Sequence, residues 1–166
     1  QTGQGIHSIA IGQSAGQTGQ GQQSVAIGLQ AGQTGQGDRS IAIGNSAGQK
    51  GQGLESVAIG NLAGQTGQGT TCVAIGLLAG QTGQGDSSIA IGKFAGQTAQ
   101  PANSIILNAS GSAVSGQTNT NSTYIKPIIQ QTGSGTATIL KHTVAGFTHV
   151  LCYNPSTGEI QAVSWS

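Results

Sequence analysis

The chain has little charge, few aromatic side chains and no long apolar run. Only 5% of its 166 residues are charged, five basic and four acidic, which gives a formal net charge of +1. Such a surface offers no basic patch to a phosphate backbone, so nucleic acid is not an expected partner. No stretch approaches the roughly 18 apolar residues of a membrane span, and membrane insertion of this segment is not expected.

Proline and cysteine are also scarce. Three prolines, together with 30 glycines that do not recur at every third position, exclude a collagen-like chain. The two cysteines, Cys72 and Cys152, lie far apart, and Cys72 stands where the neighbouring repeats have serine. We expect two unpaired thiols and no disulfide scaffold. The absence of an initiator Met and of a signal peptide favours a piece of a longer protein.

The sequence does contain a 16-residue repeat, or phrase, that occurs six times. The phrase QTGQG-x-x-S-[IV]-A-I-G-x-x-A-G begins at residues 1, 17, 33, 49, 65 and 81, and a degenerate seventh unit, QTAQPANSIILNASGS, begins at residue 97. Self-similarity at a fixed period is the signature of stacked repeats. We therefore predict a repeat domain over 1–102 and a second region over 103–166.

Each unit predicts one firm β-strand, because apolar and small residues alternate within SIAIG and glycines bound it. Stacked coils would pair each strand with the same strand of the next coil, forming an all-β parallel β-solenoid, or β-roll, of 16-residue coils. We expect the β-branched residues to fill the inside of the coil. This predicted roll core is Ile9, Ile11, Val25, Ile27, Ile41, Ile43, Val57, Ile59, Val73, Ile75, Ile89 and Ile91.

The other face of the strand would carry only Ser, Ala and Gly. Two β-branched residues per coil bury little area against the entropy of ordering 16 residues, so further burial from a second chain is expected. A stripe of small residues permits close approach of another backbone, which favours an oligomer with this stripe at its axis. The predicted axis residues are Ser8, Ala10, Ala26, Ala42, Ala58, Ala74 and Ala90.

The phrase S-[IV]-A-I-G followed by a spaced A-G resembles the head repeat of YadA-like trimeric autotransporter adhesins. It occurs at Ser8–Gly12, Ser24–Gly28, Ser40–Gly44, Ser56–Gly60, Cys72–Gly76 and Ser88–Gly92, and the resemblance extends over 1–107. It implies left-handed parallel β-rolls assembled as a homotrimer. The chain differs from the family in its uniform 16-residue spacing and its constant QTGQG.

From residue 103 the pattern changes to longer strand-like segments: NSIILNASGSAV, TYIKPII, TATILKH and FTHVLCY-NPSTG-EIQAVSW. The last predicts a β-hairpin, because turn-forming residues join two alternating runs. The order SIILNASGSA, YIKPI, LCYNPSTGEI resembles the C-terminal ends of fibre proteins in large DNA viruses and phages. A solenoid needs a cap over its last coil. We expect a β-rich cap or trimer clamp, which is compatible with a receptor-binding knob.

No catalytic, cofactor or metal site is predicted. Three histidines, His7, His142 and His149, show no metal-binding spacing, and the four carboxylates form no pair or triad. The QTGQG segment lacks the GK[ST] of a phosphate loop and the aspartates of a calcium-binding solenoid. We do not expect an enzyme.

The sequence therefore favours a homotrimeric fibre or adhesin segment, extracellular or on a virion surface, that attaches to a host glycan or surface protein. Which residues would contact a receptor is unknown. The alternative is a monomeric β-solenoid module that binds glycan or ice through its repeated Thr row, one Thr per coil except Lys50.

Overall fold

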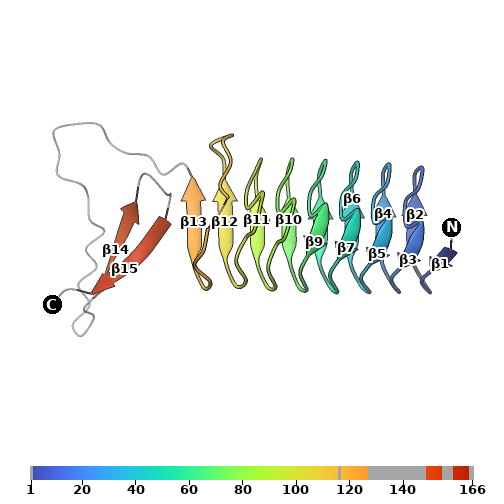
Figure 1. Ribbon diagram of the computed structural model, residues 1–166, viewed down its shortest axis with the longest axis horizontal. Coiled ribbons are helices and arrows are strands. Elements are labelled where there is room, and N and C mark those ends of the chain that lie inside the picture. The colour runs from blue at the N-terminus through green and yellow to red at the C-terminus, as the bar shows by residue number, and fades with distance from the viewer. Residues whose placement is uncertain (1, 116, 127–148, 155–158, 165–166) are drawn as a thin grey trace.

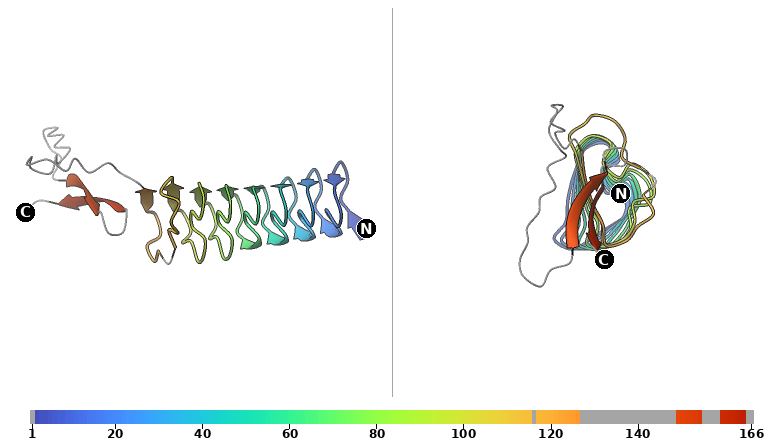
Figure 2. Two further views of the ribbon diagram at one scale, coloured as in Figure 1. Left: turned by 90° about the horizontal axis from the view of Figure 1, so that it is seen from above. Right: turned by 90° about the vertical axis from the view of Figure 1, so that its left-hand side faces the viewer.

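The computed structural model describes residues 2–115 and 117–126, and the backbone of 149–154 and 159–164. It is an elongated β-roll in which short strands are stacked along one axis (Figure 1). Seen down that axis, the coils superpose on one closed outline (Figure 2). The described residues contain no helix, so none of them could form a helix that crosses a membrane.

Two sheets form the sides of the roll. The first has five strands in the order β1-β3-β5-β7-β9, each the TGQ or KGQ of one repeat. Its strands are β1 (Thr2–Gln4), β3 (Thr18–Gln20), β5 (Thr34–Gln36), β7 (Lys50–Gln52) and β9 (Thr66–Gln68). The second has ten strands in the order β14-β15-β13-β12-β11-β10-β8-β6-β4-β2. Its first members are β2 (Ile9–Ile11), β4 (Val25–Ile27), β6 (Ile41–Ile43), β8 (Val57–Ile59), β10 (Val73–Ile75) and β11 (Ile89–Ile91).

Both sheets are parallel along the repeats, and their register follows the sequence period. Val25 pairs with Ile41, and Ala26 pairs with Ala42. Because the register equals the repeat length, every residue lies above its equivalent in the preceding coil. The predicted parallel β-solenoid with 16-residue coils is confirmed.

The parallel ladder continues beyond the regular repeats. Strand β12 (Ile105–Asn108) pairs with β11, and β13 (Thr123–Lys126) pairs with β12, both in parallel. The long sheet thus contains eight parallel rungs. The predicted repeat domain ends at residue 102, whereas the parallel ladder of the roll continues to residue 126.

The facing of the strands is the reverse of our expectation. Ala26, Ala42, Ala58, Ala74 and Ala90 have no exposed surface and form the core of the roll with the second alanine of each unit. The predicted axis residues therefore lie inside a single chain, where no second chain reaches them; Ser8 and Ala10 are half-buried because their coil is the first. The β-branched residues of the predicted roll core point outward: Ile9, Ile11, Val25, Ile27, Ile41, Ile43, Val57, Ile59, Val73, Ile75, Ile89 and Ile91 are half-buried or exposed.

The physical reason is the narrow interior of a 16-residue coil. A Cβ placed on Gly32 would lie 3.3 Å from the Cβ of Ala26 on the opposite side of the coil. At that distance Ala fills the space and a β-branched side chain would not fit. Within the six regular repeats the inside of the roll therefore selects the small residues of the alternating strand, and the larger ones face outward. In β12 and β13 the same inward position holds the larger Ile106 and Tyr124, which are buried.

A row of buried glutamines completes the interior. The second Gln of each QTGQG is almost fully buried: Gln20, Gln36, Gln52, Gln68, Gln84 and Gln100. Each reaches across the coil, as Gln36 does when its Nε2 donates to the carbonyl oxygen of Val25 at 2.8 Å. Its Oε1 lies against Gly32, where a Cβ would approach it to 2.4 Å. This contact explains why glycine precedes the phrase, since any side chain there would displace the amide.

The coil corners depend on serine and glycine. The Ser40 hydroxyl donates to the carbonyl oxygen of Gly37 at 2.6 Å and closes the turn before the strand. Gly37 lies so close to the next coil that a Cβ would approach the carbonyl group of Gly53 to 2.6 Å. Close backbone contacts at the corners and between adjacent coils thus explain why these positions of the phrase do not vary.

The end of the chain forms the predicted hairpin. Strands β14 (His149–Asn154) and β15 (Glu159–Ser164) pair in antiparallel register, from His149 with Ser164 to Asn154 with Glu159. Strand β15 also pairs with β13 in antiparallel orientation through Tyr124 and Glu159. The expected strand TATILKH and the NPSTG turn lie largely outside the described residues.

Candidate interaction surface

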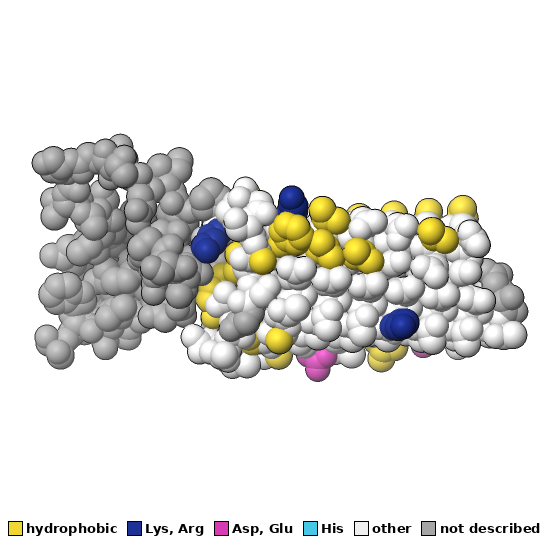
Figure 3. Space-filling view, turned by 45° about the horizontal axis from the view of Figure 1, so that its top comes forward, with side chains coloured by type: hydrophobic (Ala, Val, Ile, Leu, Met, Phe, Trp, Pro, Cys, Tyr) yellow, Lys and Arg dark blue, Asp and Glu magenta, His cyan; other side chains and the backbone are white. Residues whose placement is uncertain are grey.

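The outward face of the long sheet carries two rows of β-branched and leucine side chains. Several of them remain well exposed, among them Ile11 at 59%, Ile75 at 36% and Ile91 at 40%. Figure 3 shows hydrophobic side chains aligned along one side of the roll and gathered more densely toward its C-terminal end. We call this surface the Ile/Val face; β12 extends it with Ile105 and Leu107.

Two rows of variable residues border the Ile/Val face. The residue that follows QTGQG, just before the strand, forms the leading row: Ile6, Gln22, Asp38, Leu54, Thr70 and Asp86. The residue that follows SIAIG, just after the strand, forms the trailing row: Gln13, Leu29, Asn45, Asn61, Leu77 and Lys93. Leu29, Leu54 and Leu77 are among the exposed large hydrophobic residues. The Ile/Val face is therefore flanked by mixed apolar and polar positions.

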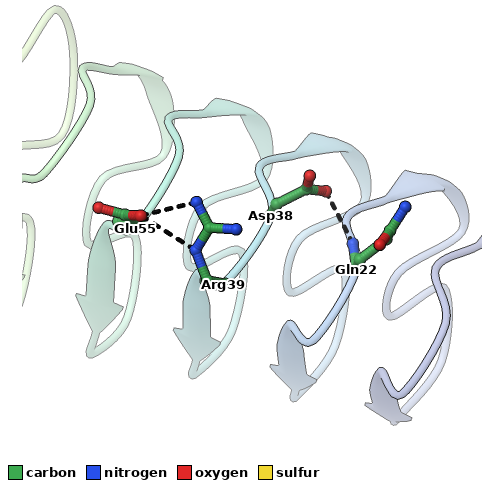
Figure 4. A network of polar contacts seen from close by, with 4 residues as sticks. All are labelled: Gln22, Asp38, Arg39 and Glu55. Carbon is green, nitrogen blue, oxygen red and sulfur yellow. Dashed lines mark hydrogen bonds and ion pairs between the residues drawn. The ribbon is translucent and has the colours of Figure 1, made fainter.

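The leading corner forms polar contacts between coils (Figure 4). Asp38 accepts a hydrogen bond from the backbone N–H of Gln22 at 2.8 Å. Beside it, Arg39 forms an ion pair with Glu55 of the next coil, with 2.6 Å between Nη2 and Oε1. Both side chains are about half exposed, so the pair stabilises the fold by roughly 1 kcal/mol at most. The charges of this corner support stacking.

The five-stranded sheet presents a second regular surface. Thr18, Thr34, Thr66 and their equivalents point to solvent, interrupted by Lys50. Beside them the first glutamines of QTGQG form an outer amide ladder, in which Gln33 Nε2 donates to Gln17 Oε1 at 3.0 Å. This polar surface is the one on which the glycan or ice alternative depends.

Cys72 is free and fully buried in the place of the repeat serine. Its Sγ lies 3.0 Å from the carbonyl oxygen of Gly85 and 3.8 Å from Ser88 Oγ. Burial raises the pKa of the thiol above its usual value. The expectation that Cys72 is an unpaired substitute for serine is confirmed; the Cys152 side chain lies outside the described residues.

The potential metal-binding side chains are dispersed in the part of the chain that the structure describes. There, no three His, Cys, Asp or Glu side chains come together in a way that could hold a metal ion. His142 lies outside the described residues, as does the side chain of His149.

Sequence reasoning missed the facing of the strand and the inner glutamine row. One signal was available for each. The Ala and Ser positions are nearly invariant among the repeats, and so is the second Gln, whereas the flanking pairs vary freely. A position confined inside a narrow coil accepts one size of side chain, so invariance of a small residue indicates burial.

One comparison with known proteins gives a match. The family model described as YadA head domain repeat (2 copies) matches residues 36–47. No curated protein and no solved structure matches the chain. The chain therefore carries YadA-like head repeats, a repeat of structural adhesins. The resemblance of the C-terminal region to viral fibre ends stays a prediction.

Proposed function

We propose that the chain is a non-enzymatic fibre or adhesin segment that assembles as a homotrimer, with the Ile/Val face of each subunit directed toward the three-fold axis. The observation that carries this proposal is the Ile/Val face itself, a continuous apolar surface along the long sheet. Large exposed apolar patches on soluble proteins mark interfaces. The YadA-like repeat supports the trimer, because the heads that it resembles are trimeric.

The energetics favour association on this face. Complete burial of an isoleucine stabilises by about 1.5–3 kcal/mol, and residues such as Ile91 keep 40% of their surface exposed in one chain. Burying that remainder would yield roughly 1 kcal/mol per residue, repeated at two positions in each coil. A thin roll with an alanine core has little other apolar area to bury, so the second chain supplies what the interior lacks.

The C-terminal region acts, in this proposal, as a cap and trimer clamp. An open parallel ladder would leave unpaired backbone groups at the last rung. The antiparallel pairing of β15 with β13 supports a cap, because it covers that edge with a strand of opposite direction. The region beyond residue 126 is also the place for a terminal receptor-binding knob.

We place the fibre outside the cell or on a virion surface, attached to a host glycan or surface protein. Support comes from the adhesin repeat and from the regularity of the outer surface. Three chains with several equal coils present many copies of one weak site, and such multivalency yields avidity without a deep pocket. The Thr and outer Gln rows are suited to hydrogen bonding with either kind of partner.

The first experiment measures the solution mass of the whole chain by light scattering after size exclusion. A mass of three chains that persists on dilution, together with retention of the labelled protein on host cells or immobilised glycans, is the expected result. A mass of one chain would overturn the fibre proposal. The monomeric module that binds glycan or ice through its Thr row would then be favoured.

A further inference from the structure

The two border rows lie at opposite ends of the same strands. Strand β11 (Ile89–Ile91) is preceded by Asp86 of the leading row and followed by Lys93 of the trailing row. In a ring of chains related by rotation about an axis parallel to the roll, the interface is heterologous. The start of each outward strand then faces the end of the same strand in the neighbouring chain, at nearly the same height.

We infer that the leading row of each subunit packs against the trailing row of the next, and that Asp86 and Lys93 form an ion pair between subunits. The inference rests on the proposed trimer and adds its seam, its register and its polar contacts. A trimer would contain three such pairs, one at each seam.

The surroundings of both charged side chains support the ion pair. The Asp86 carboxylate accepts the backbone N–H of Thr70 through Oδ1 alone, at 2.9 Å. The Lys93 ammonium lies over the Phe94 ring, 4.8 Å from its centre. Among the described residues the single ion pair is Arg39 with Glu55, so neither Asp86 nor Lys93 has an ionic partner within that part of the chain. Both residues are exposed.

The register follows from the two aspartates of the leading row. When equivalent coils face one another, Asp86 meets Lys93 and Asp38 meets Asn45, and both carboxylates find a donor. A shift of one coil toward the N-terminus would place them opposite Leu77 and Leu29. A shift in the other direction would place Asp86 opposite Ala109, which has no donor in its side chain. Only the unshifted register satisfies both.

Cysteine cross-linking tests the seam. The tested chain carries Asp86→Cys and Lys93→Cys in a background of Cys72→Ser and Cys152→Ser. A disulfide needs Cα atoms about 4.4–6.8 Å apart, so it forms only where the two rows meet. Oxidation should close each trimer covalently, and a band of three chains should appear on a non-reducing gel and disappear with reductant.

The matched control moves one cysteine by three coils. Asp86→Cys with Asn45→Cys keeps the same two rows but separates the positions by about 14 Å along the axis, given the strand spacing. This variant should remain uncross-linked. Two results would overturn the proposed seam without contradicting the proposed trimer. One is a trimeric mass without cross-linking of the 86–93 pair, and the other is equal cross-linking of the control. A monomeric mass of the unmodified chain would overturn both proposals.

Charge reversal gives a second readout. Lys93→Asp alone should weaken the trimer about tenfold in its dissociation constant, because roughly a twofold loss at an exposed pair recurs at three seams. Asp86→Lys alone should weaken it similarly, and the double variant should recover most of the loss. Single variants that leave the dissociation constant unchanged, or a double variant weaker than either, would overturn the ion pair.

Discussion

The reversed facing of the strand predicts that two variants, one altered on the inward face and one on the outward face of the long sheet, will fail in different ways. Ala58 is fully buried, and a Cβ built on Gly64 would lie only 3.2 Å from the Ala58 Cβ. The coil therefore has no room for a larger side chain at position 58. Ala58→Leu should therefore disrupt the roll itself, beyond the usual cost of about 1–3 kcal/mol for an overpacked core. We expect loss of the cooperative unfolding transition in circular dichroism, or a midpoint at least about 10 °C lower.

Ile75→Thr with Ile91→Thr should instead leave the roll folded and weaken assembly. The two side chains are 36% and 40% exposed in a single chain, and burying these remainders is worth about 1.1–2.3 kcal/mol per chain. Threonine keeps β-branching and one methyl group, so we expect a loss of about half that amount. Over three chains this is roughly 2–3 kcal/mol, or about a 30- to 150-fold weaker trimer.

Light scattering across a dilution series, with far-ultraviolet circular dichroism on the same samples, separates the two outcomes. The double threonine variant should dissociate at higher protein concentration than the unmodified chain while retaining its β-sheet spectrum. The reasoning is refuted if Ala58→Leu yields a folded monomer and the threonine variant keeps the original dissociation constant. That result would put alanine at the axis and isoleucine in the core.

Three further predictions concern the coil itself. Gly37→Ala should destabilise the roll by several kcal/mol, because the added Cβ would lie 2.6 Å from the carbonyl group of Gly53. Gly35→Ala should cost only about 1 kcal/mol, because its Cβ would lie 3.9 Å from the nearest atoms of Gly51 and the cost comes from its φ of +66°. Urea unfolding of both variants checks the difference. Thr71 is a β-branched residue at a φ of 53°, so its backbone is strained. Thr71→Asn should raise the free energy of unfolding by about 1 kcal/mol, and a lower urea midpoint than that of the unmodified chain would contradict the strain. Cys72 should resist alkylation at pH 8 until urea unfolds the chain, because the thiol is buried and burial raises its pKa. Rapid labelling of the native protein would contradict this burial. Cys72→Ser should change the free energy of unfolding by less than about 1 kcal/mol.

Much of the architecture could be predicted from the period of the sequence. A phrase repeated without insertions places each residue above its equivalent, so the register of Val25 with Ile41 follows directly from the 16-residue spacing. The alternation within SIAIG predicts the strand, and turn-forming residues predict the terminal hairpin. The extension of the ladder through β12 and β13 was less visible, because the unit between residues 109 and 122 departs from the repeated phrase.

The candidate interface could be predicted only in part, for a geometric reason. Alternation tells which residues of a strand share a face, and both Ile41 with Ile43 and Ser40 with Ala42 satisfy that rule. Which face lies inside depends on the space that the coil encloses, and that space is measured between segments from different parts of the unit, such as Gly32 and Ala26. The usual rule that large apolar residues lie inside assumes an interior wide enough for them.

The sequence by itself therefore determined the repeat, the strand positions, the parallel register and the absence of any recognisable catalytic motif. The tertiary structure decided that alanine, serine and glutamine fill the roll, and that isoleucine and valine form an outer face. The physical reason is that periodicity is a property of the chain alone, whereas burial depends on the distance between two backbone walls. In the coils of the regular repeats that distance leaves room for a methyl group at the inward strand position, so the larger side chains face outward.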